Sequence, residues 1–259
     1  MKHSFIPICL CLSISSCGNT LGVGSRISTA GTVQFSDLPP NYQASIDDAL
    51  NPEPSEVVHD LIAIAQSNPQ LEWREFDDKA YVNVATVVGD ARYYKADLNS
   101  WHQMAGHYVW VTTSPELQSK CIGFDQQPTA LIQRVREILG LAPNSPISDV
   151  VSFWVMPENL FRPAADNEIT DSTAGLSLPE NTAAWYRKWF NELRSKQYFE
   201  SDAPPPGNTA YPWTQLGYTY DWGSDQHPPQ GLSEFVINAN STVFVEAITK
   251  IEDYCANTN

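Results

Sequence analysis

The middle and end of the chain show the period of two, and the apolar runs, that are typical of β-strands. Residues 81–88 and 107–113 are rich in β-branched and aromatic side chains, so we expect a strand in each. A continuous apolar run at 150–156 predicts a central strand covered on both faces. Residues 216–222 alternate as a further strand, and 235–237 with 243–248 flank a polar turn. The last two runs therefore predict a terminal hairpin.

Helical periodicity appears in four other stretches. Residues 55–65 carry apolar side chains at 57, 61 and 64, which predicts a helix with one buried stripe. Ser114-Pro115-Glu116 is a typical helix start, and a helix from about residue 128 should stop at Gly140. Trp185 and Trp189 predict a helix that ends near residue 199, with the tryptophans in the core. Strands and helices do not alternate regularly, so we predict one α+β domain with a largely antiparallel sheet flanked by about three helices.

The first residues have the three-part layout of a secretory signal. A short basic start is followed by an apolar stretch at 5–14, and two serines precede Cys17. The apolar stretch is too short to span a membrane as a helix, which takes about 20 residues. We therefore expect residues 1–16 to be a signal peptide that is removed on export.

The order of these parts resembles the lipobox of bacterial lipoproteins. The resemblance implies that the peptide is cut just before Cys17 and that this cysteine carries acyl chains such as palmitate, which anchor the protein to a membrane. Gly18 stands where an Asp would retain the protein, so the resemblance implies the outer membrane of a Gram-negative bacterium, with the domain in the periplasm or at the cell surface. The alternative is a free secreted protein cut one or two residues away.

Proline and cysteine positions suggest how the exported chain is organised. Residues 17–54 are rich in small polar residues and proline, which predicts a lipidated tether, and residues 55–259 form the globular domain. Cys9 and Cys11 leave with the signal, so only Cys121 and Cys255 remain in the domain. An oxidising compartment favours one disulfide between these two, the alternative being two buried thiols.

Charge and missing motifs narrow the function. With 15 basic and 30 acidic residues the net charge is -15, and no basic run is present. This charge balance disfavours a nucleic-acid partner, because binding to the phosphate backbone requires clustered cations. The chain lacks a phosphate loop, a paired-cysteine metal site, a His-Glu-x-x-His helix and a nucleophile elbow. These absences remove the commonest recognisable enzyme classes.

One order of elements suggests catalysis. Arg92 comes early, Thr112 ends a strand that leads into a helix, and Glu234 starts the final strands. This order resembles ADP-ribosyltransferases, and the resemblance implies that Arg92 holds the phosphates of NAD, Thr112 shapes the nicotinamide pocket and Glu234 stabilises the oxocarbenium-like centre. Leu232 stands where many of these enzymes carry a second Glu or Gln, which favours NAD hydrolysis over transfer to a protein.

Three further groups of residues suggest binding. His102 and His107 would need an added acid to hold zinc, and their spacing of five does not place them on one helical face. Asp166, Glu168 and Asp171 offer oxygen ligands for calcium, but their order does not match the twelve-residue calcium loop. The aromatic stretch 211–222 has the composition of a carbohydrate- or peptide-binding surface, although core packing explains it equally well.

The leading functional hypothesis is an acidic binding or structural lipoprotein of the cell envelope. Its expected ligand is a small molecule, a glycan or a protein, and we expect no metal and no resident cofactor. Residues 153–163 and 211–223 resemble uncharacterised bacterial envelope proteins. The alternative is an ADP-ribosyltransferase-like or NAD-glycohydrolase enzyme that uses Arg92, Thr112 and Glu234, with NAD as its substrate.

Overall fold

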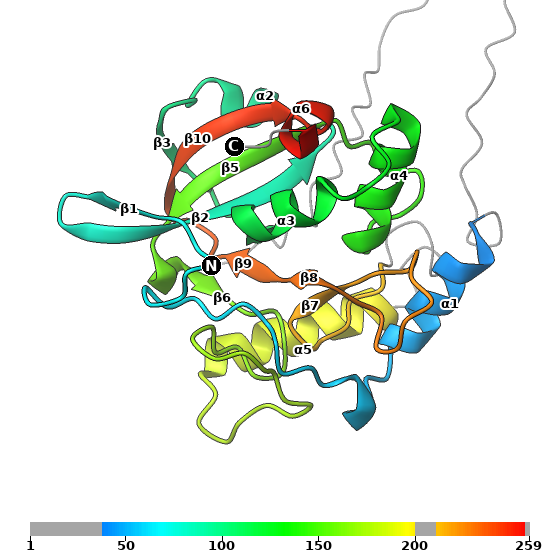
Figure 1. Ribbon diagram of the computed structural model, residues 1–259. Coiled ribbons are helices and arrows are strands. Elements are labelled where there is room, and N and C mark those ends of the chain that lie inside the picture. The colour runs from blue at the N-terminus through cyan, green and yellow to red at the C-terminus, as the bar shows by residue number, and fades with distance from the viewer. Residues whose placement is uncertain (1–37, 200–210, 257–259) are drawn as a thin grey trace, which may run out of the picture.

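The computed structural model describes residues 38–199 and 211–256 as an α+β domain (Figure 1). The helices of this part are α1 Pro40–Ala49, α2 Arg92–Lys95, α3 Ser114–Cys121, α4 Pro128–Ile138, α5 Ala184–Tyr198 and α6 Ile251–Ala256, with short 3-10 helices at Pro54–Glu56 and Pro157–Asn159. The strands are β1 Trp73–Phe76, β2 Lys79–Val88, β3 Ser100–Gln103, β4 Val109–Thr113, β5 Asp149–Val155, β6 Leu160–Phe161, β7 Tyr218–Tyr220, β8 Gln230–Ser233, β9 Phe235–Ile237 and β10 Thr242–Lys250. None of these helices is long and apolar enough to cross a membrane.

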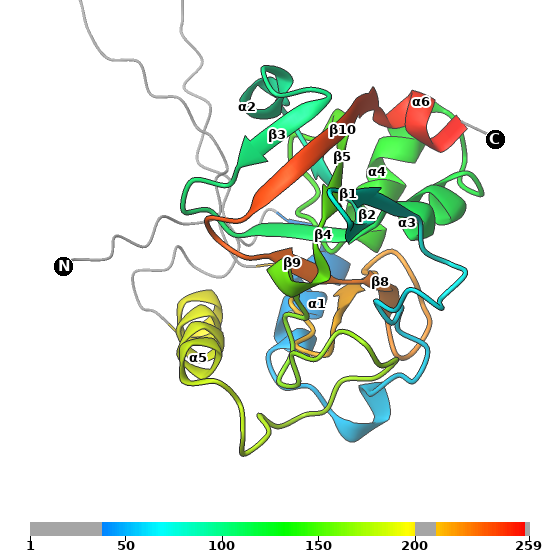
Figure 2. The same ribbon diagram turned by 90° about the vertical axis from the view of Figure 1, so that its left-hand side faces the viewer.

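Eight strands form the main sheet, in the order β3-β10-β5-β2-β4-β9-β6, with β1 paired to β2. Every strand pair in it is antiparallel, as the sequence predicts. The predicted terminal hairpin is wrong, because β9 pairs with β4 and β6 whereas β10 pairs with β3 and β5. The polar turn between them therefore carries the chain from one part of the sheet to the other (Figure 2).

The sheet curves around an inner core and is covered by helices on parts of its outer surface. Side chains from β2, β4, β5, β9 and β10 share the inner core. Outside, α3, α4 and α6 pack on one half of the β2 and β5 face, and α5 packs through aromatic side chains on β4, β6 and β9 (Figures 1 and 2). Cys121 of α3 and Cys255 of α6 form a disulfide with Cα atoms 5.2 Å apart, inside this helical layer.

Several local predictions are confirmed. Helix α3 begins at Ser114, and α4 runs from Pro128 to Ile138. Gly140 follows it with a φ of +66°, as a helix stop requires. Strand β5 lies between β10 and β2 and is buried from Val150 to Val155. Helix α5 ends at Tyr198 as expected, and Trp189 is buried in the core beneath it. Trp185 is different, because 49% of it is exposed.

The predicted helix at 55–65 is wrong. After a short 3-10 turn the segment runs extended, and its amide groups bond to other parts of the chain: Leu61 N–H to the Ser172 carbonyl (3.0 Å) and Ile64 N–H to the Ile169 carbonyl (2.7 Å). Leu61 and Ile64 then enter two different clusters of buried side chains. An extended segment can bury side chains in both clusters, whereas a helix would bury only one stripe. Burial in two clusters therefore outweighs the helical period of the sequence.

The predicted tether also ends earlier than residue 54. Residues 40–49 form α1, which buries Tyr42 and Ile46 against Trp222. Tyr42 and Trp222 meet edge to face with ring centroids 5.3 Å apart. The last part of the expected tether therefore belongs to the folded domain, while Cys17 and the residues expected to form a signal peptide lie outside the described residues.

Candidate functional site

Arg92 lies on the surface at the start of α2. Its Nε atom is 2.5 Å from Asp90 Oδ2, and its side chain is almost fully exposed. The N–H groups of Arg92 hold the pKa of Asp90 below its usual value. Both views place α2 beside β3 and β10, away from β8 and β9, between which Glu234 lies (Figures 1 and 2).

Thr112 belongs to a buried polar network around Glu116. Its Oγ1 donates to Glu116 Oε2 (3.2 Å), and the backbone N–H of Ser233 donates to Glu116 Oε1 (3.1 Å). Ser233 Oγ also donates to Glu116 and accepts from Ile62 N–H at 2.8 Å. Burial raises the pKa of Glu116 to about 7, and the hydrogen bonds from Ser233 and Thr112 oppose that rise. The hydrogen bonds of this network together link β4, α3, β8 and the extended segment that contains Ile62.

Glu234 is buried, and it forms no ion pair with a described residue. Its backbone N–H donates to the Gly217 carbonyl (2.9 Å), whereas no described group donates to its carboxyl. Burial alone raises the pKa of Glu234 to about 8. No contact joins Arg92, Thr112 and Glu234 in the described part of the chain, so the geometry does not bring the ADP-ribosyltransferase-like residues together.

The acidic loop at 166–171 packs around a buried arginine side chain and does not form the candidate calcium site. Arg162 is fully buried; its Nε donates to the Glu168 carbonyl (3.0 Å) and its Nη2 to the Asp171 carbonyl (3.0 Å). The carboxylates of the loop accept from nearby backbone amides, for example Glu168 Oε1 from Thr170 N–H at 2.6 Å. Within the described ranges no three acidic, histidine or cysteine side chains gather as a metal site.

A close approach at Gly217 gives the first prediction. Gly217 has a φ of +80°, and a Cβ there would lie 2.5 Å from Cδ of Arg162. Because both the backbone and the space exclude a side chain, we expect Gly217→Ala to lower the free energy of unfolding by about 2 to 3 kcal/mol. Urea unfolding would measure the change. Gly175→Ala is the control, since a Cβ there meets nothing within 4 Å; equal effects of the two variants would contradict the prediction.

The two candidate zinc histidines, His102 and His107, both lie beside the ring of Tyr93. His102 is buried, and its Nδ1 is 2.7 Å from Asp97 Oδ2. Its ring meets the ring of Tyr93 edge to face at 4.8 Å, and His107 lies on another side of Tyr93 at 6.3 Å. Asp97, the nearby acid that a zinc site would need, is therefore already hydrogen-bonded to His102.

The aromatic stretch 211–222 builds the core, so the interpretation of this stretch as a binding surface is wrong. Trp213, Tyr218 and Trp222 are buried, and their polar atoms bond to backbone carbonyls. Trp213 Nε1 donates to the Pro163 carbonyl (2.8 Å), and Tyr218 Oη donates to the Glu56 carbonyl (2.9 Å). Only Tyr218–Tyr220 form a strand here, because the aromatic rings fill the space between α1, α5 and the sheet.

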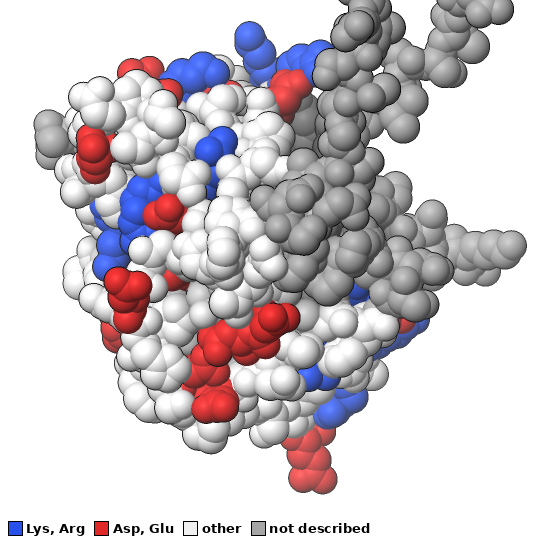
Figure 3. All heavy atoms as spheres, turned by 90° about the vertical axis from the view of Figure 1, so that its right-hand side faces the viewer, with Lys and Arg blue, Asp and Glu red and all other residues white. Residues whose placement is uncertain are grey.

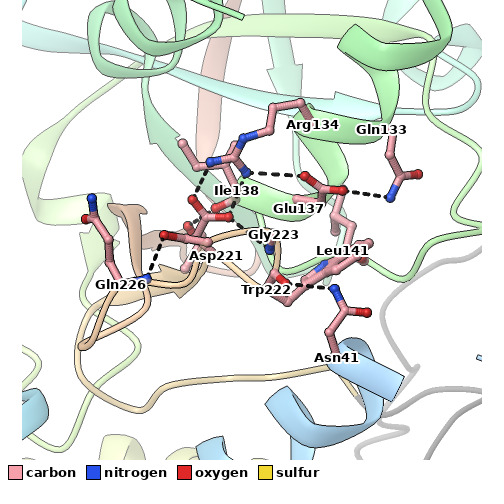
Figure 4. A network of polar contacts seen from close by, with 12 residues as sticks. Asn41, Gln133, Arg134, Glu137, Ile138, Leu141, Asp221, Trp222, Gly223 and Gln226 are labelled. Carbon is pink, nitrogen blue, oxygen red and sulfur yellow. Dashed lines mark hydrogen bonds and ion pairs between the residues drawn. The ribbon is translucent and has the colours of Figure 1, made fainter. Parts of the chain in front are cut away.

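A hollow of about 450 Å³ lies along α4, lined in part by Phe124, Gln133 and Arg134. Arg134 donates to both carboxylate oxygens of Asp221 at 2.6 and 2.5 Å (Figure 4). Its guanidinium also lies 5.0 Å from the ring of Phe124. Glu137 lies 3.6 Å from Arg134 on the same helix. The one cation of the hollow is therefore already paired within the protein, and the contacts join α4 to the loop after β7.

A different surface carries a cluster of aromatic side chains, of which one is exposed, two are partly exposed and two are buried. We call it the aromatic face, and it consists of Phe76, Tyr81, Trp101, Trp154 and Phe244. The register places Phe244 of β10 between Trp101 of β3 and Trp154 of β5. Phe76, from β1, lies 5.0 Å from Phe244 and 5.2 Å from Trp101, measured between ring centroids. Trp101 is 41% exposed, and Phe76 and Phe244 are partly exposed.

The aromatic face continues the face that the helices cover. On β5, Val150 packs under α3, α4 and α6, and Trp154 lies four residues further along, on the same side because side chains alternate. On β2, Ala85 and Tyr81 have the same relation. The helical layer thus covers one half of this face and leaves the aromatic half without a helix. No sequence motif marks it, because its five residues come from five different strands.

Charge on the surface is mixed. On the face shown in Figure 3, acidic and basic groups are interspersed, and the basic groups form no continuous patch there.

Comparison with protein-family models, curated proteins and solved structures gives no significant match.

Proposed function

We propose that the protein is a lipid-anchored binding protein of the cell envelope, held in the outer membrane of a Gram-negative bacterium through Cys17. The support is the signal layout with serines before Cys17, together with a disulfide between the two domain cysteines, which suits an oxidising compartment. The domain carries most of a net charge of -15, which keeps it away from anionic surfaces and leaves the lipid as its attachment.

The aromatic face is the observation that carries the binding function. Large aromatic side chains that stay exposed together mark interaction surfaces, because burying them against a ligand is favourable. Trp101 is 41% exposed although its neighbours Tyr81 and Trp154 are buried, so a partner would find a ring already fixed in place. The fixed ring lowers the entropy lost on binding. We therefore assign ligand binding to this face.

Cys17 provides a direct test of the anchor. Cells fed a radioactive fatty acid should label the parent protein and fail to label Cys17→Ala. Cys121→Ala, which removes a cysteine of the domain, is the control and should keep its label. Label on Cys17→Ala, or none on the parent, would reject the anchor.

Trp101 provides the test of the binding face. The full chain is compared in a Cys17→Ala background, so that acyl chains do not cause sedimentation. We expect this chain to co-sediment with lipid-extracted envelope material of its own bacterium, and Trp101→Ala to bind at least fivefold more weakly. Trp185→Ala is the matched control, because Trp185 is an exposed tryptophan (49%) on α5, outside the aromatic face.

A further inference from the structure

The rings of the aromatic face form a row across neighbouring strands. Trp101, Phe244 and Trp154 stand in register on three neighbouring strands, and strands lie about 4.8 Å apart, so the row spans about 10 Å. The ring planes meet at steep angles, for example 82° between Trp101 and Phe244, which fixes each ring by its neighbour. A surface of this shape suits an extended chain more than a small enclosed molecule.

The charges on the aromatic face cancel within the protein. Arg74 Nη1 lies 2.6 Å from Glu246 Oε2, and the indole Nε1 of Trp154 donates to the same oxygen at 2.9 Å. The guanidinium of Arg74 lies 4.8 Å from the ring of Trp154. Glu246 stands at the bulge of β10, which turns its side chain toward this pair. With both charges engaged, the centre of the face offers no free charge to a ligand; the exposed Lys79, opposite Phe76, lies at its edge. The net charge of -15 opposes anions.

Polar groups continue the row at the open end of β3 and β10. Gln103 lies two residues after Trp101 and Thr242 two before Phe244, so both share the side of the rings. Thr242 Oγ1 donates to Gln103 Oε1 at 2.7 Å, and Gln103 donates to the Asn240 carbonyl. Both side chains are exposed, with lone pairs or N–H groups left to a ligand. Rings with uncharged donors and acceptors beside them match a ligand that has apolar C–H faces and hydroxyl edges.

We infer that the ligand of the aromatic face is an uncharged saccharide chain. This inference rests on the proposed binding function. The pyranose C–H faces would lie on the rings of Trp101 and Phe244, and the hydroxyl groups would bond to Gln103 and Thr242. Anionic polymers fit less well, because Arg74 is paired with Glu246 and the chain has a net charge of -15. Since Trp101 lies on β3, an edge strand of the sheet, displacement by a peptide is one of the outcomes that the test must distinguish.

Competition identifies the ligand class. Envelope material is lipid-extracted and divided: one part is digested with protease to release peptides, and the protease-treated residue is partially hydrolysed with acid and separated into neutral and charged oligosaccharides. The neutral oligosaccharides should displace the full chain, in its Cys17→Ala background, from untreated material. Gln103→Ala and Thr242→Ala should each raise the concentration needed for half displacement at least threefold, while Trp185→Ala should not.

The outcomes separate this inference from the proposed function. If binding depends on Trp101 but the neutral oligosaccharides do not displace the protein, the saccharide inference is rejected and the binding face stands. Displacement by the peptides or only by the charged fraction rejects it in the same way. If Trp101→Ala binds as tightly as the parent, the proposed function itself is rejected.

Discussion

Removing the disulfide by Cys121→Ala with Cys255→Ala is expected to lower the free energy of unfolding by about 5 kcal/mol. The two residues are 134 positions apart, so the bond closes a loop that holds more than half of the described domain. A cross-link of this length restricts the unfolded chain strongly, because the entropy of loop closure grows with the logarithm of loop length. Both side chains are buried in the helical layer, and alanine there adds a small cavity cost.

Urea unfolding with and without a reductant measures this effect. The reduced parent should unfold near the midpoint of the double variant, and reductant should leave the double variant unchanged. If the parent and the double variant share a midpoint under oxidising conditions, the bond does not stabilise the domain.

Stability is also expected to fall as pH rises from about 5 to 8. Burial raises the pKa of Glu116 to about 7 and that of Glu234 to about 8, both above the ordinary value of 4.5. The folded state therefore holds protons that the unfolded state releases, so these groups favour folding fully below pH 4.5 and lose that contribution as pH rises through 7 and 8. We expect Glu234→Gln to raise the free energy of unfolding at pH 8 by about 3 to 4 kcal/mol and to change it little at pH 4.

A matched control separates burial from net charge. Glu180→Gln changes the charge by the same amount at an exposed position, so it should leave the pH profile of the parent in place. Denaturant titrations at several pH values between 4 and 8.5 give the comparison. A profile of Glu234→Gln that still declines as steeply as that of the parent would show that Glu234 does not bind the proton.

The sequence predicts the elements whose signals are local. Ser114-Pro115-Glu116 and Gly140 carry the chemistry of a helix start and a helix stop, and α3 and α4 follow them. The apolar run at 150–156 predicts a central strand because a strand covered on both faces needs no polar side. The cysteine count likewise leaves one pair for the disulfide.

The predictions that failed depend on distant partners. Residues 55–65 have a helical period, yet the carbonyls of Ser172 and Ile169 and the hydroxyl of Ser233 pair their amides in an extended form. The turn at 238–241 reads as a hairpin, but β9 and β10 each find better partners elsewhere in the sheet. Neither partner is visible from the local pattern.

The candidate site shows the same limit. The aromatic residues at 211–222 attract attention because they lie close together in the sequence, yet Trp213, Tyr218 and Trp222 are buried. The aromatic face collects one residue from each of five strands, so its signal exists only after the register of β1, β2, β3, β5 and β10 is known. Trp101 was the one member that a sequence could mark, as a tryptophan in a short polar strand.

The central claim is that the aromatic face binds an envelope ligand, and one paired measurement tests it most directly. Binding isotherms to lipid-extracted envelope material are recorded for Trp101→Ala and Trp185→Ala, each in the Cys17→Ala background. Trp185→Ala should keep the affinity of the parent, and Trp101→Ala should lose at least fivefold. Equal affinities for the two variants would contradict it.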